Sequence, residues 1–154
     1  MSAMEVAAGA VGPTGPQGPT GATGPMGPSA EYLVVHVEVN DPNGDALTTG
    51  DGKAYVIIPF LAAGADLVRV DVAVTTVSSS GAVEVRVRNV TQAAYMLTVN
   101  PVVDAGEKNN STGTAAVIDA ANDDVASLDE LRIDVVQAGT GVKGLVVLLT
   151  FDLP

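Results

Sequence analysis

The stretch GAVGPTGPQGPTGATGPMGPS, residues 9–29, places a glycine at every third position through seven consecutive triplets. Three polyproline II chains that wind around one another leave no room for a side chain at their common axis, so a collagen triple helix requires glycine at each third residue. The repeat therefore predicts a collagen-like triple helix over residues 9–29 and a homotrimeric protein. The glycines that it uses are Gly9, Gly12, Gly15, Gly18, Gly21, Gly24 and Gly27.

The other positions of the repeat predict a rod that needs help to stay assembled. Proline fills the first position after glycine in five triplets and never the second, so hydroxyproline cannot stabilise the helix, which favours a bacterial or viral collagen. No charged residue lies between Val6 and Ala30, so ion pairs between chains cannot set their stagger. At about 3 Å per residue the rod is about 60 Å long. We therefore expect residues 30–154 to hold the trimer together.

Residues 1–8 form a short leader before the repeat. The leader carries Glu5 and no basic segment, and the apolar residues that follow are too few for a secretory signal peptide. It is either a frayed tail or an anchor that docks the trimer on a larger particle. A collagen-like protein without an export signal fits assembly in a host cytoplasm and release by lysis, as happens to the parts of a virion.

Beyond residue 29 the sequence period changes from three to two, which is typical of β-strands. Turn signals separate the alternating segments, and only residues 120–128 suggest a helical turn. This pattern predicts an all-β head at residues 30–154, an antiparallel sandwich of about eight strands, and that number favours a jelly roll. The expected strands lie within residues 33–39, 54–59, 68–74, 83–88, 95–99, 114–118, 131–135 and 144–153.

Two of these strands carry more specific predictions. In residues 68–74 every second residue is a valine, so all of these valines, Val68 included, are expected to face the core. Residues 144–153 are apolar on both faces, with Val146 and Leu148 on the second one. A strand buried on two sides is typical of the centre of a sheet whose outer face meets another surface. Val146 and Leu148 are therefore the candidate residues of the trimer interface.

The composition excludes several classes of function. The net charge is −11, and the head holds 17 of the 18 acidic residues with all seven basic ones, which argues against nucleic acid and anionic membranes as partners. The longest apolar run, residues 54–65, is interrupted by Pro59 and Gly64 and falls short of the roughly 20 residues of a membrane span, so no membrane insertion is expected. The absence of cysteine excludes disulfides and thiol catalysis.

A short collagen rod followed by a small β head resembles the trimeric surface fibres of tailed bacteriophages. It is more loosely similar to the jelly rolls of bacterial spore hairs and to the heads of complement C1q and tumour necrosis factor. Within the head, residues 128–135 (LDELRIDV) with 139–147 (GTGVKGLVV) resemble the closing strand pair of phage appendage domains, and residues 50–59 (GDGKAYVIIP) resemble an early strand. The resemblance implies a structural protein that decorates a capsid or tail.

Catalytic chemistry has little support in the sequence. His36 is the single histidine, so a nucleophile, base and acid arrangement would depend on that residue alone. Glu38 lies on the same face of the expected strand. We interpret His36 as a solvated or interface residue, with a metal or pH-sensitive site formed by three copies on a threefold axis as the alternative. We expect no catalytic residues, no enzymatic activity and no cofactor.

A few polar clusters are candidates for weaker sites. Asp41, Asn43 and Asp45 have the alternating oxygen spacing of a calcium loop, but the glutamate that completes such a loop is missing, and an Asx-rich turn has the same sequence. They are weak calcium candidates. The remaining acidic and basic groups are interpreted as solubilising surface (Asp123, Asp124, Asp129) and as cross-strand ion pairs (Arg69, Asp71, Glu84, Arg86, Arg88).

Carbohydrate binding usually recruits exposed aromatic residues, and this chain has no tryptophan, so a strong sugar site within one protomer is not expected. The aromatic residues are Tyr32, Tyr55, Phe60, Tyr95 and Phe151.

Together, these observations favour a homotrimeric phage fibre or capsid or tail decoration protein on the virion surface. The leader would bind other virion proteins, and the head would attach to the host surface, where glycans are candidate partners. Two alternatives remain open: a glycan- or calcium-dependent receptor-binding lectin module, and a bacterial spore or cell-surface filament protein.

Overall fold

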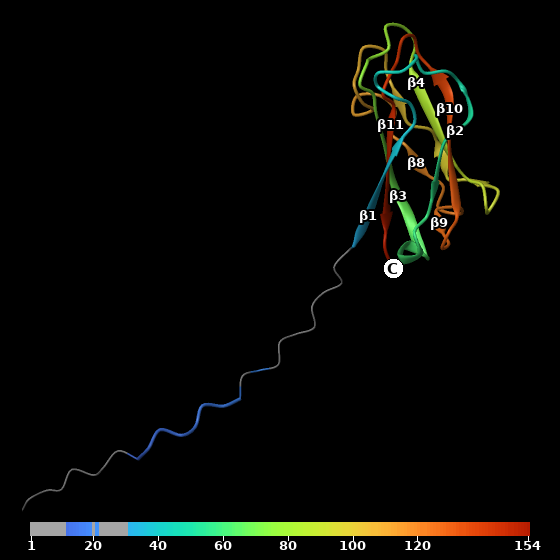
Figure 1. Cartoon of the computed structure of the whole chain (residues 1–154). Coiled ribbons are helices and arrows are strands. Elements are labelled where there is room, and N and C mark those ends of the chain that lie inside the picture. The colour runs from blue at the N-terminus through green and yellow to red at the C-terminus, as the bar shows by residue number, and fades with distance from the viewer. Residues whose placement is uncertain (1–11, 20, 22–30) are drawn as a thin grey trace, which may run out of the picture.

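The computed structural model describes residues 12–19, 21 and 31–154 (Figure 1). The leader and the repeat glycines Gly9, Gly24 and Gly27 lie outside the described residues. Residues 12–19 are exposed and extended, without helix or strand. The structure therefore describes the head from residue 31 onward and a part of the repeat.

The first sheet has four antiparallel strands in the order β1-β11-β3-β9. The first strand of the head and the last one pair along their whole length, and β3 lies on the other side of β11. Both ends of the head chain consequently lie together, and the Leu153 N–H donates to the Glu31 carbonyl at 2.8 Å. The strands are β1 (Tyr32–Glu38), β11 (Val146–Asp152), β3 (Ala65–Ala73) and β9 (Asp124–Val125).

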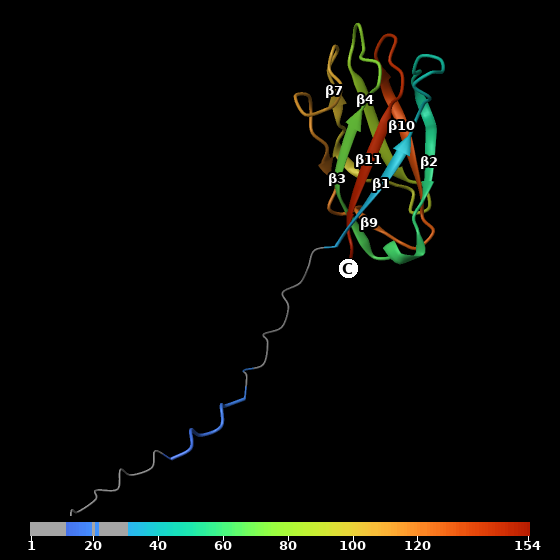
Figure 2. The ribbon, with the colours of Figure 1, turned by 60° about the vertical axis from the view of Figure 1, so that its left-hand side comes forward.

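The second sheet packs behind the first one, with the order β2-β10-β4-β5 and with β7 also paired to β4 (Figure 2). All of its pairs are antiparallel. Its strands are β2 (Gly50–Ile57), β10 (Glu130–Ala138), β4 (Val83–Asn89), β5 (Ala94–Tyr95) and β7 (Val102–Val103). The remaining elements are the short pair β6 (Leu97–Val99) and β8 (Val117–Ile118) and one 3-10 turn, η1 (Phe60–Ala62).

The described residues thus form an all-β, antiparallel protein without an α-helix, as the period of two predicted. The helical turn expected at residues 120–128 is wrong. Asp119 instead starts a turn, because its carboxylate accepts the Ala121 N–H at 3.2 Å and its carbonyl accepts the Asn122 N–H at 2.8 Å. The chain then adds β9 to the edge of β3.

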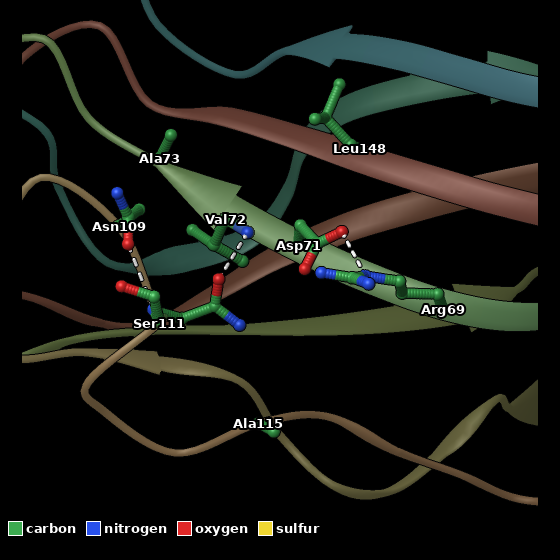
Figure 3. Close-up of a pocket in the computed structure, with 9 residues that line it drawn as sticks. Arg69, Asp71, Val72, Ala73, Asn109, Ser111, Ala115 and Leu148 are labelled. Atoms are coloured by element: carbon green, nitrogen blue, oxygen red, sulfur yellow. Dashed lines mark hydrogen bonds and ion pairs between the residues drawn. The ribbon is translucent and has the colours of Figure 1, made fainter.

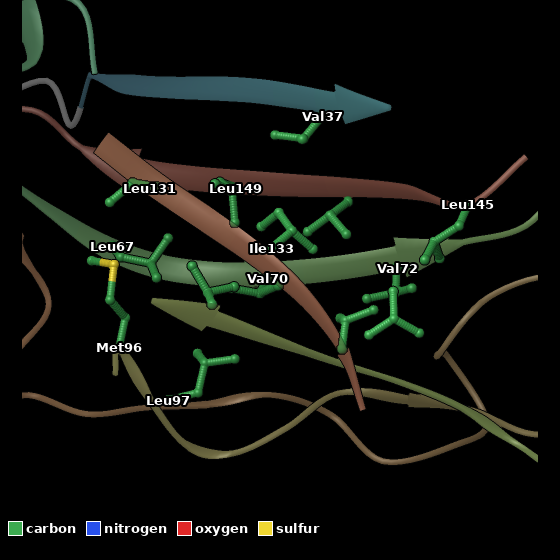
Figure 4. Close-up of a cluster of buried hydrophobic side chains, with 14 of the residues drawn as sticks. Val37, Leu67, Val70, Val72, Met96, Leu97, Leu131, Ile133, Leu145 and Leu149 are labelled. Atoms are coloured by element: carbon green, nitrogen blue, oxygen red, sulfur yellow. The ribbon is translucent and has the colours of Figure 1, made fainter. Parts of the chain in front are cut away.

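A single aliphatic core fills the space between the two sheets (Figure 4). Inward-facing residues of β11 and β10 meet there, and the polar residues between them point outward, as expected for strands with one buried face. Valine and leucine dominate, and Phe151 is the single buried ring. Fully buried members include Val85, Val87, Leu131, Ile133, Val147, Leu149 and Phe151.

A β-bulge interrupts the alternation of β3. Thr150 of β11 pairs with Arg69, whereas the next residue of β11 pairs with Leu67, so Val68 is an extra residue without a partner. Leu67 and Val70 are 1% and 2% exposed, but Val68 is 44% exposed. The prediction that Val68 faces the core is wrong, because a prediction that assumes strict alternation does not detect an inserted residue.

Because of the bulge, we expect substitutions at Val70 and Val68 to have different effects on the free energy of unfolding. Val70→Ala removes buried methyl groups and should lower the free energy of unfolding by about 2 kcal/mol. Val68→Ala removes exposed ones and should change it by less than about 0.5 kcal/mol. Urea unfolding followed by circular dichroism measures both values, and equal losses would contradict the bulge.

Candidate functional site

The most distinctive surface of the head is the outer side of β1, β11 and β3, which we call the β11 face. It consists of the outward residues of these strands. As predicted, β11 is a central strand, between β1 and β3. Its outward residues Val146 and Leu148 are half-buried by their neighbours. The face is formed by Val34, His36, Asp71, Ala73, Val146 and Leu148.

Strand register brings both predicted interface residues to the middle of this face. His36 of β1 and Asp71 of β3 lie opposite Leu148, and Glu38 and Ala73 lie opposite Val146. Toward the chain ends, Val34 and Tyr32 are 56% and 59% exposed. The β11 face therefore has an apolar centre at Val146, Leu148 and Ala73. Charged residues of β1 and β3 border this centre, and Thr150 and Asp152 follow it along β11.

A hollow of about 580 Å³ opens beside Leu148 at the β3 side of this face (Figure 3). The segment that follows β7 forms its far wall, because Asn110 ties this segment to β3. The Asn110 side chain accepts the Val72 N–H at 3.1 Å, and its backbone N–H donates to the Val72 carbonyl at 3.2 Å. Arg69, Asp71, Ser111 and Ala115 complete the lining.

The charges around the hollow are paired with each other. The Arg69 Nε lies 2.6 Å from the Asp71 carboxylate on the same strand. This hydrogen bond and the charge of Asp71 raise the pKa of Arg69 above its usual value. Because Arg69 is exposed, the pair contributes little to stability. Among the described residues that line the hollow, the two charged groups are Arg69 and Asp71, and they neutralise each other.

The other predicted sites are dispersed. His36 projects from the exposed side of β1, and among the described residues its imidazole makes no hydrogen bond. Asp41 is used within its own turn, where its carboxylate accepts the Asn43 N–H at 2.7 Å, and Asn40 donates to the Asp45 carbonyl at 3.2 Å. Over residues 31–154, no three histidine or acidic side chains gather in a way that could hold a metal ion.

Asp129 is not part of a solubilising acidic patch, which corrects the prediction for that residue. Its side chain is 2% exposed and joins two loops of the second sheet. One carboxylate oxygen accepts hydrogen bonds from Asn89 at 2.7 Å, Gln92 at 2.8 Å and the Ala126 N–H at 2.9 Å. Burial raises the pKa of Asp129, but these three bonds outweigh burial and bring the pKa below its usual value.

Asp134 is a second buried carboxylate, on the outer side of β10. It is 1% exposed because two arginines cover it. Arg132 and Arg86 reach it at 2.7 Å and 3.3 Å, and the Gly52 N–H donates to it at 2.8 Å. Burial raises the pKa of Asp134, and the bonds from Arg132 and Gly52 lower it to a net value below the usual one. Sequence reasoning missed this buried carboxylate, because an aspartate at an outward position of a strand normally indicates exposure.

The predicted ion pairs between neighbouring strands need correction. β3 and β4 belong to different sheets, so Arg69 and Asp71 have no partners on β4. Arg86 pairs instead with Asp134 and, at 3.4 Å, with Asp51. Glu84 accepts a hydrogen bond from Asn100 at 2.7 Å.

Comparison of the chain with family models, with curated proteins and with solved structures finds no match. Within the part of the chain that the structure describes, there is no helix of the length and hydropathy needed to cross a membrane. The function is therefore argued from the repeat and from the surfaces of the head.

The buried Asp129 predicts an acid-sensitive head. Asp129→Ala leaves three donors without an acceptor and should lower the free energy of unfolding at pH 7 by about 3 kcal/mol. The pKa of Asp129 is lower in the folded state than in the unfolded state. The ionised carboxylate therefore makes its full contribution to the free energy of unfolding well above pH 4, and this contribution disappears as the pH falls through the folded-state pKa. Urea unfolding between pH 7 and pH 3 should therefore show a smaller acid-induced loss in the variant.

The exposed Asp104 provides the matched control, since Asp104→Ala removes the same charge from the surface. It should retain both the stability and the acid response of the natural protein. An unchanged acid response in Asp129→Ala would contradict the assignment.

Proposed function

We propose that the protein is a non-enzymatic, homotrimeric surface protein of a bacteriophage virion, a fibre or a capsid or tail decoration. In this proposal the leader binds other virion proteins, the repeat forms a collagen-like rod and the head is displayed for attachment to the host surface. In this proposal the protein is made in the host cytoplasm and displayed on the virion surface. The observation that carries the proposal is the strict glycine repeat followed by a head with an apolar outer face.

The described part of the repeat supports a multichain rod. Gly12, Gly15, Gly18 and Gly21 do not have the positive φ angles that favour glycine, and a Cβ built on any of them meets no atom within 4 Å. Within one chain, neither backbone conformation nor crowding calls for glycine at these positions. The head differs, because its glycines at turns, such as Gly139 and Gly144, combine positive φ with close neighbours. A triple helix supplies the missing reason for the repeat.

The strand order of the head supports a jelly roll. In chain order the first strand pairs with the last, β2 pairs with β10, and β11 and β10 pair next with β3 and β4. β9 extends the first sheet beyond β3, and β5 and β7 pair with β4 at the far side of the second sheet. Such nesting of early strands with late strands in two sheets is how a jelly roll winds its two Greek keys.

The β11 face supports trimerisation by the head. β1 continues the chain from the repeat, so this face belongs to the sheet that receives the rod. Val146, Leu148 and Val34 give it apolar area that a monomer leaves partly in water. Three copies that pack these faces around one axis would cover this area and bring the starts of their rods together. Many trimers on one particle would then convert weak contacts into avidity.

The rod can be tested with one substitution. Gly18→Ala in the full chain should place a methyl group at the crowded axis and abolish or markedly lower the thermal transition of the triple helix in circular dichroism. Gln17→Ala, which changes the neighbouring position outside the axis, should keep that transition. The melting of the head should be unchanged in both, and equal behaviour of the two variants would contradict the triple helix.

The head interface can be tested with a charge. Leu148→Glu should introduce three like charges near the axis and weaken the trimer by at least tenfold in its dissociation constant, measured by sedimentation velocity over a dilution series. Ile57→Glu is the control, because Ile57 is an exposed apolar residue on the outer side of the other sheet. A trimer that is equally stable in both variants would show that the β11 face is not the interface.

A further inference from the structure

The outer side of the second sheet carries a single row of four side chains, which we call the arginine row. Tyr55 of β2 lies opposite Arg132 of β10, Arg132 lies opposite Arg88 of β4, and Arg88 lies opposite Tyr95 of β5. Four neighbouring strands thus place two arginines between two tyrosines. At about 4.8 Å per strand, the row is about 14 Å long between its outer Cα atoms.

One arginine of this row has no carboxylate partner. Arg132 is paired with Asp134 and, at 3.3 Å, with Asp51. Arg86 lies two residues before Arg88 on β4, and it pairs with the same two aspartates as Arg132. Among the described residues, no acidic group lies within 4.0 Å of Arg88, and its buried Nε atom makes no hydrogen bond. In a chain of net charge −11, this half-buried guanidinium is a specific place for an anionic group.

Both rings of the row are exposed and held in place. Tyr95 is 39% exposed, and its ring packs against the guanidinium carbons of Arg86 and Arg88, at 4.3 Å and 5.3 Å from its centre. Tyr55 is 55% exposed. Its hydroxyl group lies over Gly52, where a Cβ would collide with it, so the glycine lets the tyrosine lean along its strand.

We propose that the arginine row binds an acidic oligosaccharide, with Arg88 holding a sugar carboxylate and the two tyrosines packing against the flanking sugar rings. An aromatic ring offers an apolar face to the C–H face of a sugar and, in tyrosine, a polar tip to its hydroxyl groups. A guanidinium group matches a carboxylate with two parallel hydrogen bonds. The row crosses four neighbouring strands, so it offers an elongated site to a short saccharide chain.

This inference deepens the proposed function, because it names the host-surface component that the head would contact. The row lies on the sheet opposite the β11 face, so a trimer built on that face leaves the row accessible on each protomer. Single-stranded nucleic acid also stacks on aromatic rings beside arginines, but such sites need an extended basic groove. Here Asp51 and Asp134 lie among the same arginines.

The test is calorimetric titration of the full chain with hexasaccharides of glucuronic, galacturonic, mannuronic and sialic acid. A neutral glucose hexasaccharide and a thymidine hexanucleotide are titrated in parallel. At least one acidic hexasaccharide should bind, at least about tenfold more tightly than the neutral one. The absence of binding to all four acidic probes at millimolar concentration overturns the inference, and so does equal affinity for the neutral sugar or for the nucleotide.

Matched variants locate the site. Arg88→Gln should weaken binding at least about tenfold, because it removes the group that holds the carboxylate. Tyr55→Ala should weaken binding about fivefold or more, and this second variant tests the row if Arg88→Gln does not fold. The controls are Lys108→Gln and Phe60→Ala, which remove an exposed cation and an exposed aromatic ring at positions outside both the arginine row and the β11 face, and they should change affinity less than twofold. Equal losses in variants and controls overturn the site.

The outcome is separable from that of the proposed function. If the protein is a monomer and each chain still binds an acidic hexasaccharide through Arg88, the site is retained and the trimer is rejected. A trimer that binds none of the acidic probes would reject the site and leave the rod and head arrangement intact.

Discussion

The space at the axis of a three-chain helix is the constraint on which the account depends. Only hydrogen fits there, so a chain that forms such a helix must carry glycine at each third position. This chain does so seven times in succession. Glycine is otherwise costly in an extended chain, because it loses the most conformational freedom on ordering. Since a single chain gives no local reason for the four described glycines, Gly12, Gly15, Gly18 and Gly21, we infer that the repeat serves an assembly of chains.

In the proposed assembly, the head sets the register of the three chains, which the rod alone cannot set. A short, uncharged rod does not set its own register, and a sandwich with an aliphatic core offers a rigid surface to do so. The two outer sides of this sandwich differ in character. The β11 face has an apolar centre and belongs to the sheet whose strand β1 continues the chain from the repeat, whereas the outer side of the second sheet carries arginines, the buried carboxylate of Asp134 and two exposed tyrosines. In the proposed function, one side would form the trimer interface and the other would bind the host surface.

Alternation predicted the fold class well because burial on one side of a strand imposes a period of two. It predicted the central position of β11 from Val146 and Leu148 for the same reason. It failed at Val68, where a bulge inserts a residue, and at residues 120–128, where hydrogen bonds of Asp119 form a turn. It also missed Asp129, Asp134 and the arginine row, because strand pairing brings together residues that are far apart in sequence.

The mass of the intact full chain in solution tests the central claim most directly. Native mass spectrometry, repeated over a range of micromolar concentrations, weighs the assembly without any assumption about its shape. The account predicts one dominant species with three times the mass of the chain. A dominant species with the mass of one chain would contradict it, because neither the triple helix nor a trimeric head can exist in a monomer.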